Sequence, residues 1–156
     1  MTLAEHIMSE TIFEKVADQV KVAMKARDKE RVAALRLMMA EFKRVEIDER
    51  IKLDDQRVLA ILDKMTKQRN ESKRQFSEAG RSDLEEKEAF ELAVIADFMP
   101  EQLSEDVIEN LVDEAIREVG ASNMREMGDV MSVLKMKAQG RADLGKISAL
   151  VKAKLS

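Results

Sequence analysis

The sequence predicts an all-α protein, in which a bundle of about four helices is followed by a small three-helix tail domain. Two observations support this fold class. The 156 residues contain one proline and five glycines, and 37% of the residues are charged. Apolar residues recur at three- and four-residue spacing along most of the chain, which is the period of a helix with one buried face. No stretch shows the alternation that predicts a strand.

Residues 1–99 are predicted to form the N-terminal helical domain, whose first helix runs from about Ser9 to Ala26. Asp28 is the predicted N-cap of the second helix, and Asp54 or Asp55 caps the third, because their short side chains accept hydrogen bonds from the first turn. The apolar stripes of the four helices fall within residues 13–24, 32–45, 58–76 and 90–99.

Turn signals separate the third helix from the fourth. Gly80 is predicted to end the third helix in the left-handed conformation. Ser82 and Glu85 have the spacing of a capping box and predict the start of the fourth helix there. Pro100 ends this helix, because proline cannot continue it. The short segment that follows is the predicted domain boundary.

Residues 100–156 are predicted to form the three-helix tail domain. Ser104 caps its first helix, and Gly120 ends it. The second helix starts at Ser122 or Asn123, and Asp143 caps the third. The apolar stripe of the second helix is Met124, Met127, Met131 and Leu134.

Composition excludes several chemistries. The chain has no cysteine, which removes disulfides, thiolate metal sites and thiol nucleophiles. Its one histidine, His6, is predicted to be a surface residue without a catalytic partner. Gly140 to Lys146 fits most of a phosphate-binding loop, but Ile147 replaces the magnesium-binding hydroxyl and no strand precedes it. A helix stop followed by an aspartate cap is the favoured interpretation. We therefore predict no catalytic residue, no metal and no cofactor.

No stretch is apolar enough to predict a membrane span, and the first residues lack the pattern of a secretion signal, so we expect a cytoplasmic protein that does not bind a membrane. The net charge is −4, but it is distributed unevenly. Residues 82–120 carry two basic residues against thirteen acids, whereas residues 121–156 carry seven against three.

The basic residues form two groups. One lies on the predicted third helix and contains Lys64, Lys67, Arg69, Lys73 and Arg74. The other lies in the tail and contains Lys135, Lys137, Arg141, Lys146, Lys152 and Lys154. A helix start near Arg141 and Lys146 can accept a phosphate. Because the chain has no Tyr or Trp for base stacking, any RNA contact should be to the backbone. The alternative is that both groups are simply solvated helix faces.

Several short motifs, taken together and in order, resemble the YqeY family. These are Lys29–Arg36, Lys67–Arg69, Phe76–Arg81, Glu91–Ile95, Met99–Ser104, Met127–Met131 and Gly140–Asp143. The tail of such proteins is similar to that of GatB, the aminoacyl-tRNA-binding subunit of the tRNA-dependent amidotransferase, and to a module of some glutaminyl-tRNA synthetases. The resemblance places the tail motif on Gly128, Gly140, Arg141, Asp143, Lys146 and Ser148.

The resemblance implies a tRNA-associated module that has no enzymatic activity of its own. Its predicted RNA contacts are Lys135, Lys137, Gly140, Arg141, Lys146, Ser148 and Lys152, with the basic group of the third helix as a second surface. One alternative is an adaptor that binds a translation enzyme, such as an aminoacyl-tRNA synthetase or amidotransferase. Another is an auxiliary to carbon–nitrogen ligase activity with glutamine as the amido donor.

Overall fold

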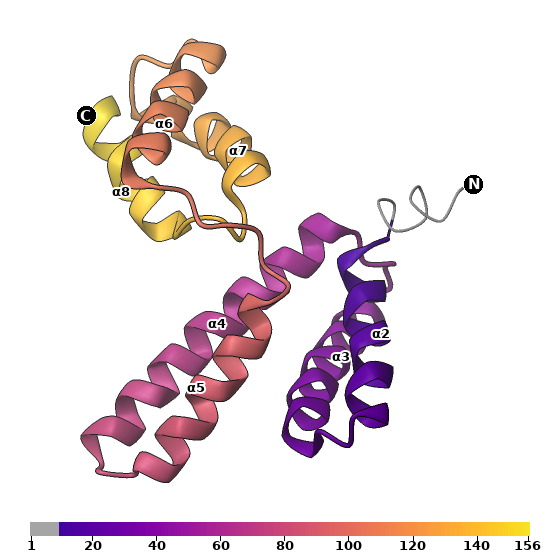
Figure 1. Ribbon diagram of the computed structural model, residues 1–156. Coiled ribbons are helices and arrows are strands. Elements are labelled where there is room, and N and C mark those ends of the chain that lie inside the picture. Colours follow the sequence, from indigo (N-terminus) through magenta and orange to yellow (C-terminus); the bar gives the residue numbers. More distant parts are fainter. Residues whose placement is uncertain (1–9) are drawn as a thin grey trace. The chain divides into compact units, whose positions relative to one another are not determined.

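The computed structural model describes residues 10–156, and the chain divides between Met99 and Pro100 into two compact units. Figure 1 shows helices and connecting loops but no strand in this range, so the all-α prediction is confirmed for the described residues. The predicted helix start at Ser9 and the surface position of His6 lie outside that range. The helices are α2 Ile12–Lys25, α3 Lys29–Glu49, α4 Asp55–Glu78, α5 Ser82–Ala96, α6 Glu105–Val119, the 3-10 turn η1 Met124–Glu126, α7 Met127–Ala138 and α8 Leu144–Leu155.

Unit 1, described here from residue 10 to 99, consists of two helical hairpins, α2–α3 and α4–α5 (Figure 1). Helix α3 contacts each of the other three helices. Its buried face is Ala34, Leu35, Met38, Phe42 and Val45. The ring of Phe42 is fully buried, and its centroid lies 5.7 Å from that of Phe13 in α2. The core of unit 1 is therefore built around one face of α3.

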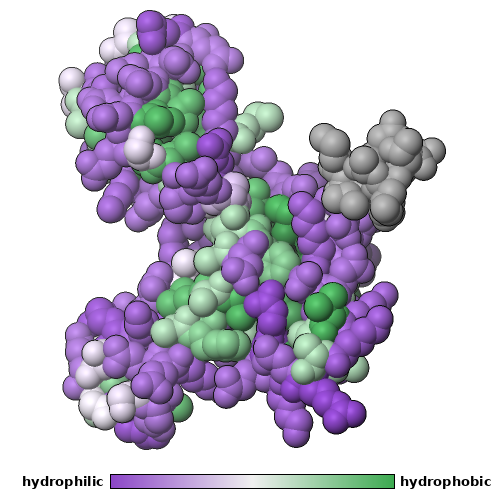
Figure 2. All heavy atoms as spheres, viewed as in Figure 1, coloured by the Kyte–Doolittle hydropathy of each residue, from purple (hydrophilic) through white to green (hydrophobic). Residues whose placement is uncertain are grey.

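Polar contacts at the ends of the helices join the hairpins of unit 1. The backbone N–H of Ile12 donates to Asp55 Oδ1 at 2.8 Å, which links the starts of α2 and α4. The Arg31 Nη1 donates to Asp97 Oδ2 at 3.1 Å, which links the start of α3 to the end of α5. Figure 2 shows a largely hydrophilic surface, with a patch of apolar residues on unit 1 where α3 and α5 lie beside each other.

The local signals for helix ends are mostly confirmed in unit 1. Asp28 caps α3 by accepting from the N–H of Arg31 at 3.1 Å. Asp54 caps α4 in the same way, so that the alternative cap, Asp55, is the first helical residue. Gly80 has φ of +70° and follows α4 in the left-handed conformation. A short polar side chain three residues from a free N–H is enough to produce such caps.

The predicted capping box at Ser82 is wrong. Arg81 is the N-cap of α5, and no side chain caps this helix. The reason is the way α4 ends: the N–H of Gly80 bonds to Ser77 O, and the N–H of Arg81 bonds to Phe76 O. This pair of bonds is a Schellman motif, and it sets the backbone directly before Ser82. Helix α5 starts at once, and Ser82 is inside it.

Unit 2, residues 100–156, is a three-helix arrangement in which α6, α7 and α8 all contact one another. Ser104 caps α6, Gly120 ends it with φ of +73°, and Asp143 caps α8, all as predicted. The core of this unit is Val112, Ala115, Val130, Leu134, Ala138, Ala142, Ile147, Val151 and Leu155.

The first turn of the predicted second tail helix differs from the expectation. Asn123 starts it, but the turn is the 3-10 segment η1, and α7 begins only at Met127. Met124, predicted on the core stripe, is 40% exposed. A 3-10 turn has three residues per turn, so it rotates its side chains out of the 3.6-residue register of the following helix.

Unit 1 should tolerate substitution on one side of α3 and not on the other. We expect Phe42→Ala to lower the free energy of unfolding by about 3–5 kcal/mol, because it leaves a cavity among buried side chains. Ile47 lies on the same helix but is 75% exposed. Ile47→Ala should change stability by less than about 0.5 kcal/mol. Urea unfolding followed by circular dichroism measures both; equal effects would contradict the burial pattern.

Candidate functional site

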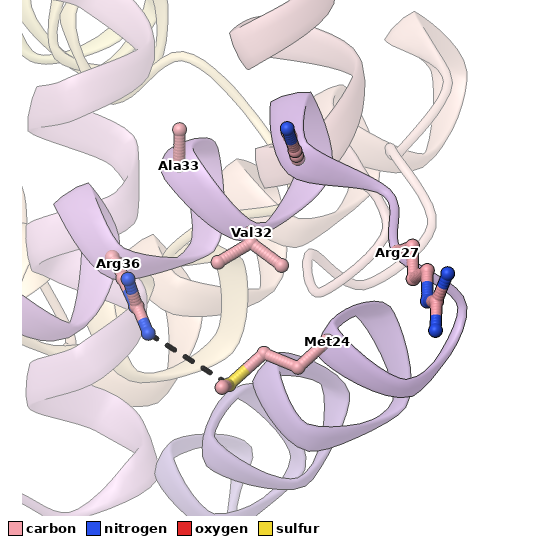
Figure 3. Close-up of a pocket in the computed structure, with 6 residues that line it drawn as sticks. Met24, Arg27, Val32, Ala33 and Arg36 are labelled. Atoms are coloured by element: carbon pink, nitrogen blue, oxygen red, sulfur yellow. Dashed lines mark hydrogen bonds between the residues drawn. The ribbon is translucent and has the colours of Figure 1, made fainter.

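An apolar pocket of about 430 Å³ lies between the end of α2 and the start of α3 (Figure 3). It is lined by Met24, Arg27, Lys29, Val32, Ala33 and Arg36. Figure 3 shows the side chain of Met24 extending toward Arg36, whose Nη2 donates to the Met24 sulfur at 3.7 Å. A thioether is a weak acceptor, so this contact does not neutralise the guanidinium. The pocket thus has an apolar floor and a cationic rim.

A second pocket shares Ala33 with the first and opens between α3 and α5. It is lined by Glu30, Ala33, Ala34, Asp83, Glu86, Lys87, Phe90 and Glu91. Its apolar part is Phe90, which is 36% exposed, together with the two alanines. The rim on this side is mainly acidic, so the two pockets carry charges of opposite sign.

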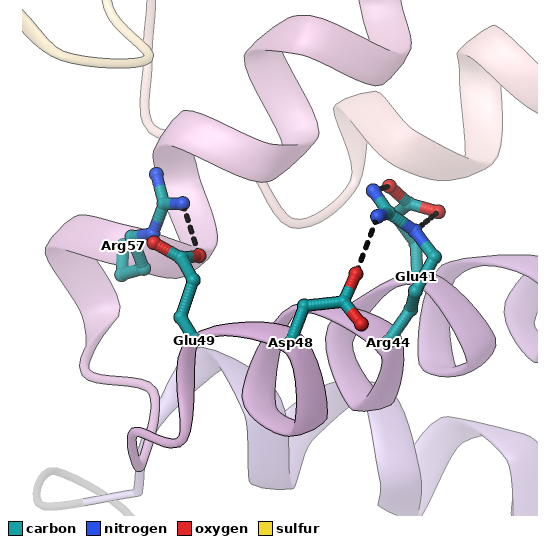
Figure 4. Close-up of polar contacts among 5 residues, drawn as sticks. All are labelled: Glu41, Arg44, Asp48, Glu49 and Arg57. Carbon is teal, nitrogen blue, oxygen red and sulfur yellow. Dashed lines mark hydrogen bonds and ion pairs between the residues drawn. The ribbon is translucent and has the colours of Figure 1, made fainter.

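A polar groove lies between α3 and α4, and its charges compensate one another (Figure 4). The guanidinium of Arg44 lies between Glu41 and Asp48, with 3.0 Å from Nη1 to Asp48 Oδ2. The hydrogen bonds from Arg44 lower the pKa of Glu41 below its ordinary value of 4.5. Glu49 of α3 pairs with Arg57 of α4, across the groove. Such a balanced set stabilises packing and offers little net charge to a ligand.

Arg69, predicted as part of the second basic surface, lies in a largely buried ion pair. Its Nε donates to Glu91 Oε2 at 3.0 Å, and the two side chains are 16% and 11% exposed. The pair joins α4 to α5 within their hairpin. The guanidinium therefore compensates the only buried charged side chain among the described residues.

The other members of the second basic group do not share one surface. Residues three, four or seven apart lie on one side of a helix, so Lys64, Lys67 and Arg74 face one way and Lys73 lies with Arg69. Arg74 pairs with Glu71 at 2.5 Å and with Glu78 at 2.6 Å. Lys67 pairs with Asp63 at 3.6 Å, and Lys64 lines the polar groove. Neighbouring carboxylates offset most of this charge.

In unit 2, the turn at Gly140 and Arg141 is bound to the segment that precedes α6. Gly140 is buried with φ of +76°, and its carbonyl accepts from Gln102 Nε2 at 2.9 Å. The carbonyl of Arg141 accepts from the N–H of Leu103 at 2.8 Å. The Arg141 Nε donates to Glu101 O at 3.4 Å. This half-buried arginine holds the turn as well as presenting charge.

The start of α8 is occupied by its own cap. Asp143 Oδ1 accepts from the N–H of Gly145 at 2.8 Å, so a carboxylate stands where we expected a phosphate. Lys146 lines a pocket with Glu105, Ile108 and Glu109 of α6. Lys146 therefore lies beside two acidic residues of α6. The helix start is a poor anion site, because two negative groups would meet there.

Ion pairs show which sides of α7 and α8 face α6. Lys137 of α7 pairs with Glu118 of α6 at 3.3 Å. Lys154 of α8 pairs with Asp113 at 2.5 Å and with Glu109 at 3.7 Å. Hydrogen bonding to Asp113 raises the pKa of Lys154 above its ordinary value of 10.5. Each of these lysines is directed to the acidic helix of the unit.

The remaining tail residues lie on the other sides of these two helices. Successive helical residues are about 100° apart. On α7, Lys137 marks the side that faces α6, and the buried core stripe lies next to it around the helix. Lys135 and Gly128 lie beyond that stripe, on the side of α7 turned toward α8. Ser148 and Lys152 fall on the side of α8 turned toward α7. We call these four residues the α7–α8 face. Helix α8 contains no acid, and α7 contains only Asp129.

No described group of residues has the arrangement of a metal site or of a membrane-spanning helix. Residues 10–156 contain no cluster of three or more His, Cys, Asp or Glu side chains that could hold a metal ion. Within the same range, no helix is both long and apolar enough to cross a membrane.

Comparison with known families decides the relationship of the chain. A family model described as Yqey-like protein matches residues 13–155. The chain belongs to the YqeY-like family. The match spans both units, and the resemblance deduced from the short motifs is confirmed. No curated protein matches the chain.

Sequence reasoning identified the basic residues of this YqeY-like chain but missed how they are paired. The partners of Arg69, Lys137 and Lys154 lie 22, 19 and 41 residues away, and no local pattern reveals them. The triad of Glu41, Arg44 and Asp48 was detectable, because i,i+3 and i,i+4 spacing places such charges together.

The Arg69–Glu91 pair should behave as a buried pair. We expect Arg69→Ala to destabilise unit 1 by about 3 kcal/mol, because Glu91 would be left charged and buried. Arg69→Met combined with Glu91→Met should be nearly neutral. Arg74→Ala, which breaks exposed pairs, is the control and should have little effect. Urea denaturation compares the variants; a double variant as unstable as Arg69→Ala would contradict this assignment.

Glu88 provides a pH test of the same hairpin. Burial and the charge of Glu91 raise the pKa of Glu88 above 4.5. The folded state then binds this proton more tightly than the unfolded state, so stability falls as pH rises above about 4.5. We expect Glu88→Gln to stabilise the protein at pH 7 and to flatten its stability between pH 4.5 and 7. Thermal unfolding across that range checks the sign.

Proposed function

We propose that this YqeY-like protein is a non-catalytic, tRNA-associated module that contacts the RNA backbone through the α7–α8 face. The observation that supports the proposal is the segregation of charge in unit 2. Helix α6 carries six acids and one arginine, whereas residues 127–155 carry six basic residues and two acids. Phosphate would be repelled from α6 and attracted to the opposite face.

The α7–α8 face has the chemistry that backbone contact needs. Lys135 and Lys152 offer ammonium groups, Ser148 offers a hydroxyl, and Gly128 leaves space for close approach. Phosphate oxygens accept hydrogen bonds from all three polar side chains. Arg141 and Lys146 lie at the edges of this region, and we expect weaker contributions from them because of that position. Lys137 is paired with Glu118 and should contribute least.

The relation to the amidotransferase tail supports tRNA as the nucleic acid. The tail of YqeY-like proteins is similar to the tail domain of GatB, the amidotransferase subunit that binds aminoacyl-tRNA. The chain has no cysteine, and its one histidine is His6. We therefore propose binding without catalysis. An auxiliary part in glutamine-dependent amidation would operate through tRNA delivery to another enzyme.

Charge reversal tests the binding face. We expect Lys135→Glu with Lys152→Glu to weaken tRNA binding at low salt by about tenfold or more. The slope of the logarithm of the binding constant against the logarithm of the salt concentration should become less negative by about one for each phosphate contact that is lost. Lys15→Glu with Lys21→Glu makes the same charge change on α2 and should have a small effect. Gel shifts across a salt series measure both. Equal losses in the two variants would exclude a specific face.

Catalysis is tested separately. Purified protein supplied with glutamine, ATP and glutamyl-tRNA should form no glutaminyl-tRNA, because we propose a binding role alone. Acid gel electrophoresis of labelled aminoacyl-tRNA detects the product. Turnover by the protein alone that is lost after charge reversal at Lys135 and Lys152 would contradict the proposed binding role and would show that the protein is itself an amidotransferase.

A further inference from the structure

Helix α3 presents a second apolar stripe on the side opposite its buried face. Ala33, Leu37, Ala40 and Ile47 lie on it, and all four are exposed. Leu37 is 46% and Ile47 75% exposed. Their separations of four, three and seven residues match the contact positions of one helix packed along another. We call these four residues the outer stripe of α3.

One edge of the outer stripe is basic. Lys29, Arg36 and Lys43 follow it at seven-residue intervals, and all three are exposed. Within residues 10–156, none of them forms an ion pair, and Arg36 donates a hydrogen bond to the Met24 sulfur. Two of them line the apolar pocket between α2 and α3 (Figure 3). This edge therefore offers uncompensated positive charge beside apolar surface.

The other edge is acidic. Glu30 and Glu86 line the pocket between α3 and α5, beside Ala33 and Phe90. Further along α3, Glu41 and Asp48 lie on the same edge, where Arg44 already binds them. Figure 2 shows apolar residues reaching the surface over the region between α3 and α5. The surface is thus an apolar strip, interrupted by Arg44 between Ala40 and Ile47, with edges of opposite sign.

We propose that the outer stripe of α3 is a docking surface for an amphipathic helix of a partner protein. The apolar side chains of that helix cover Ala33, Leu37 and Phe90. Its acidic edge lies over Lys29, Arg36 and Lys43, and its basic edge lies over Glu30 and Glu86. The small side chains of Ala33 and Ala40 permit close approach of a second helix. This surface lies in unit 1 and does not depend on RNA binding by unit 2.

Charge complementarity selects this occupant over others. A nucleic acid would meet the acidic edge and an apolar strip, neither of which suits phosphate. A second copy of the chain brings like charges together in either direction. An antiparallel copy places basic edge against basic edge, and a parallel copy places Arg44 beside its own equivalent in the strip. Specific helix pairs avoid such contacts.

Two synthetic helical peptides of about 21 residues, the length of α3, test the proposal with the full chain. Both carry leucine at the contact positions. The matched peptide has glutamate on the edge that faces Lys29, Arg36 and Lys43 and lysine on the other edge. The swapped peptide exchanges the two edges and keeps the composition. Fluorescence anisotropy of the labelled peptides measures binding.

The matched peptide should bind at least about tenfold more tightly than the swapped peptide, since only it pairs opposite charges along both edges. Arg36→Glu with Lys43→Glu should reverse this preference, and Ala33→Glu should weaken the matched peptide by about tenfold or more. Ala153→Glu, the same change at an exposed position of α8, is the control. Thermal melts check that each variant folds.

Equal binding of the two peptides, or no binding of either, would overturn the proposal. So would a protein that is dimeric by analytical ultracentrifugation and becomes monomeric in Ala33→Glu, because the stripe would then be covered by a second copy.

Discussion

The architecture of unit 1 depends on the burial of one face of α3. Leu35, Met38 and Phe42 supply the largest fully buried side chains, and α3, like α4, contacts the other three helices of the unit. A chain with five phenylalanines and no Tyr or Trp has few large side chains with which to build a core. Packing Leu35, Met38 and Phe42 of α3 against Leu62 of α4 and Ile95 of α5 lets two hairpins share a single apolar centre.

The same constraint explains why one side of α3 is buried while the opposite side exposes apolar residues to solvent. The hairpins cover one side of the helix, and the opposite side is left with alanines, Leu37 and Ile47 in contact with solvent. The edges of that exposed side differ in charge because Lys29, Arg36 and Lys43 recur every seven residues, while acids come from both α3 and α5. An asymmetry of this kind gives direction to binding, which a purely apolar groove would lack.

Charge is distributed differently in the two units. In unit 1, most arginines are paired with acids of the same helix or of a helix in contact with it, and the Arg69–Glu91 pair is nearly buried. In unit 2, acids gather on α6 and lysines on α7 and α8. Lys137 and Lys154 are drawn to α6, which leaves the side formed by Lys135, Ser148 and Lys152 without a carboxylate on α8. The net charge of the whole chain conceals this arrangement.

The sequence by itself determined the all-α class, the family and most helix ends. Asp28, Asp54, Ser104 and Asp143 cap helices through bonds to residues two or three positions away, so local pattern was sufficient. The candidate site was predictable only in composition: the basic residues were identified, but not their directions. The tertiary structure decided that Arg69 meets Glu91, that Lys137 and Lys154 meet α6, and that Ser82 follows a Schellman turn rather than capping α5. These outcomes depend on residues that become neighbours only after the helices pack, because packing sets which side of each helix remains in water.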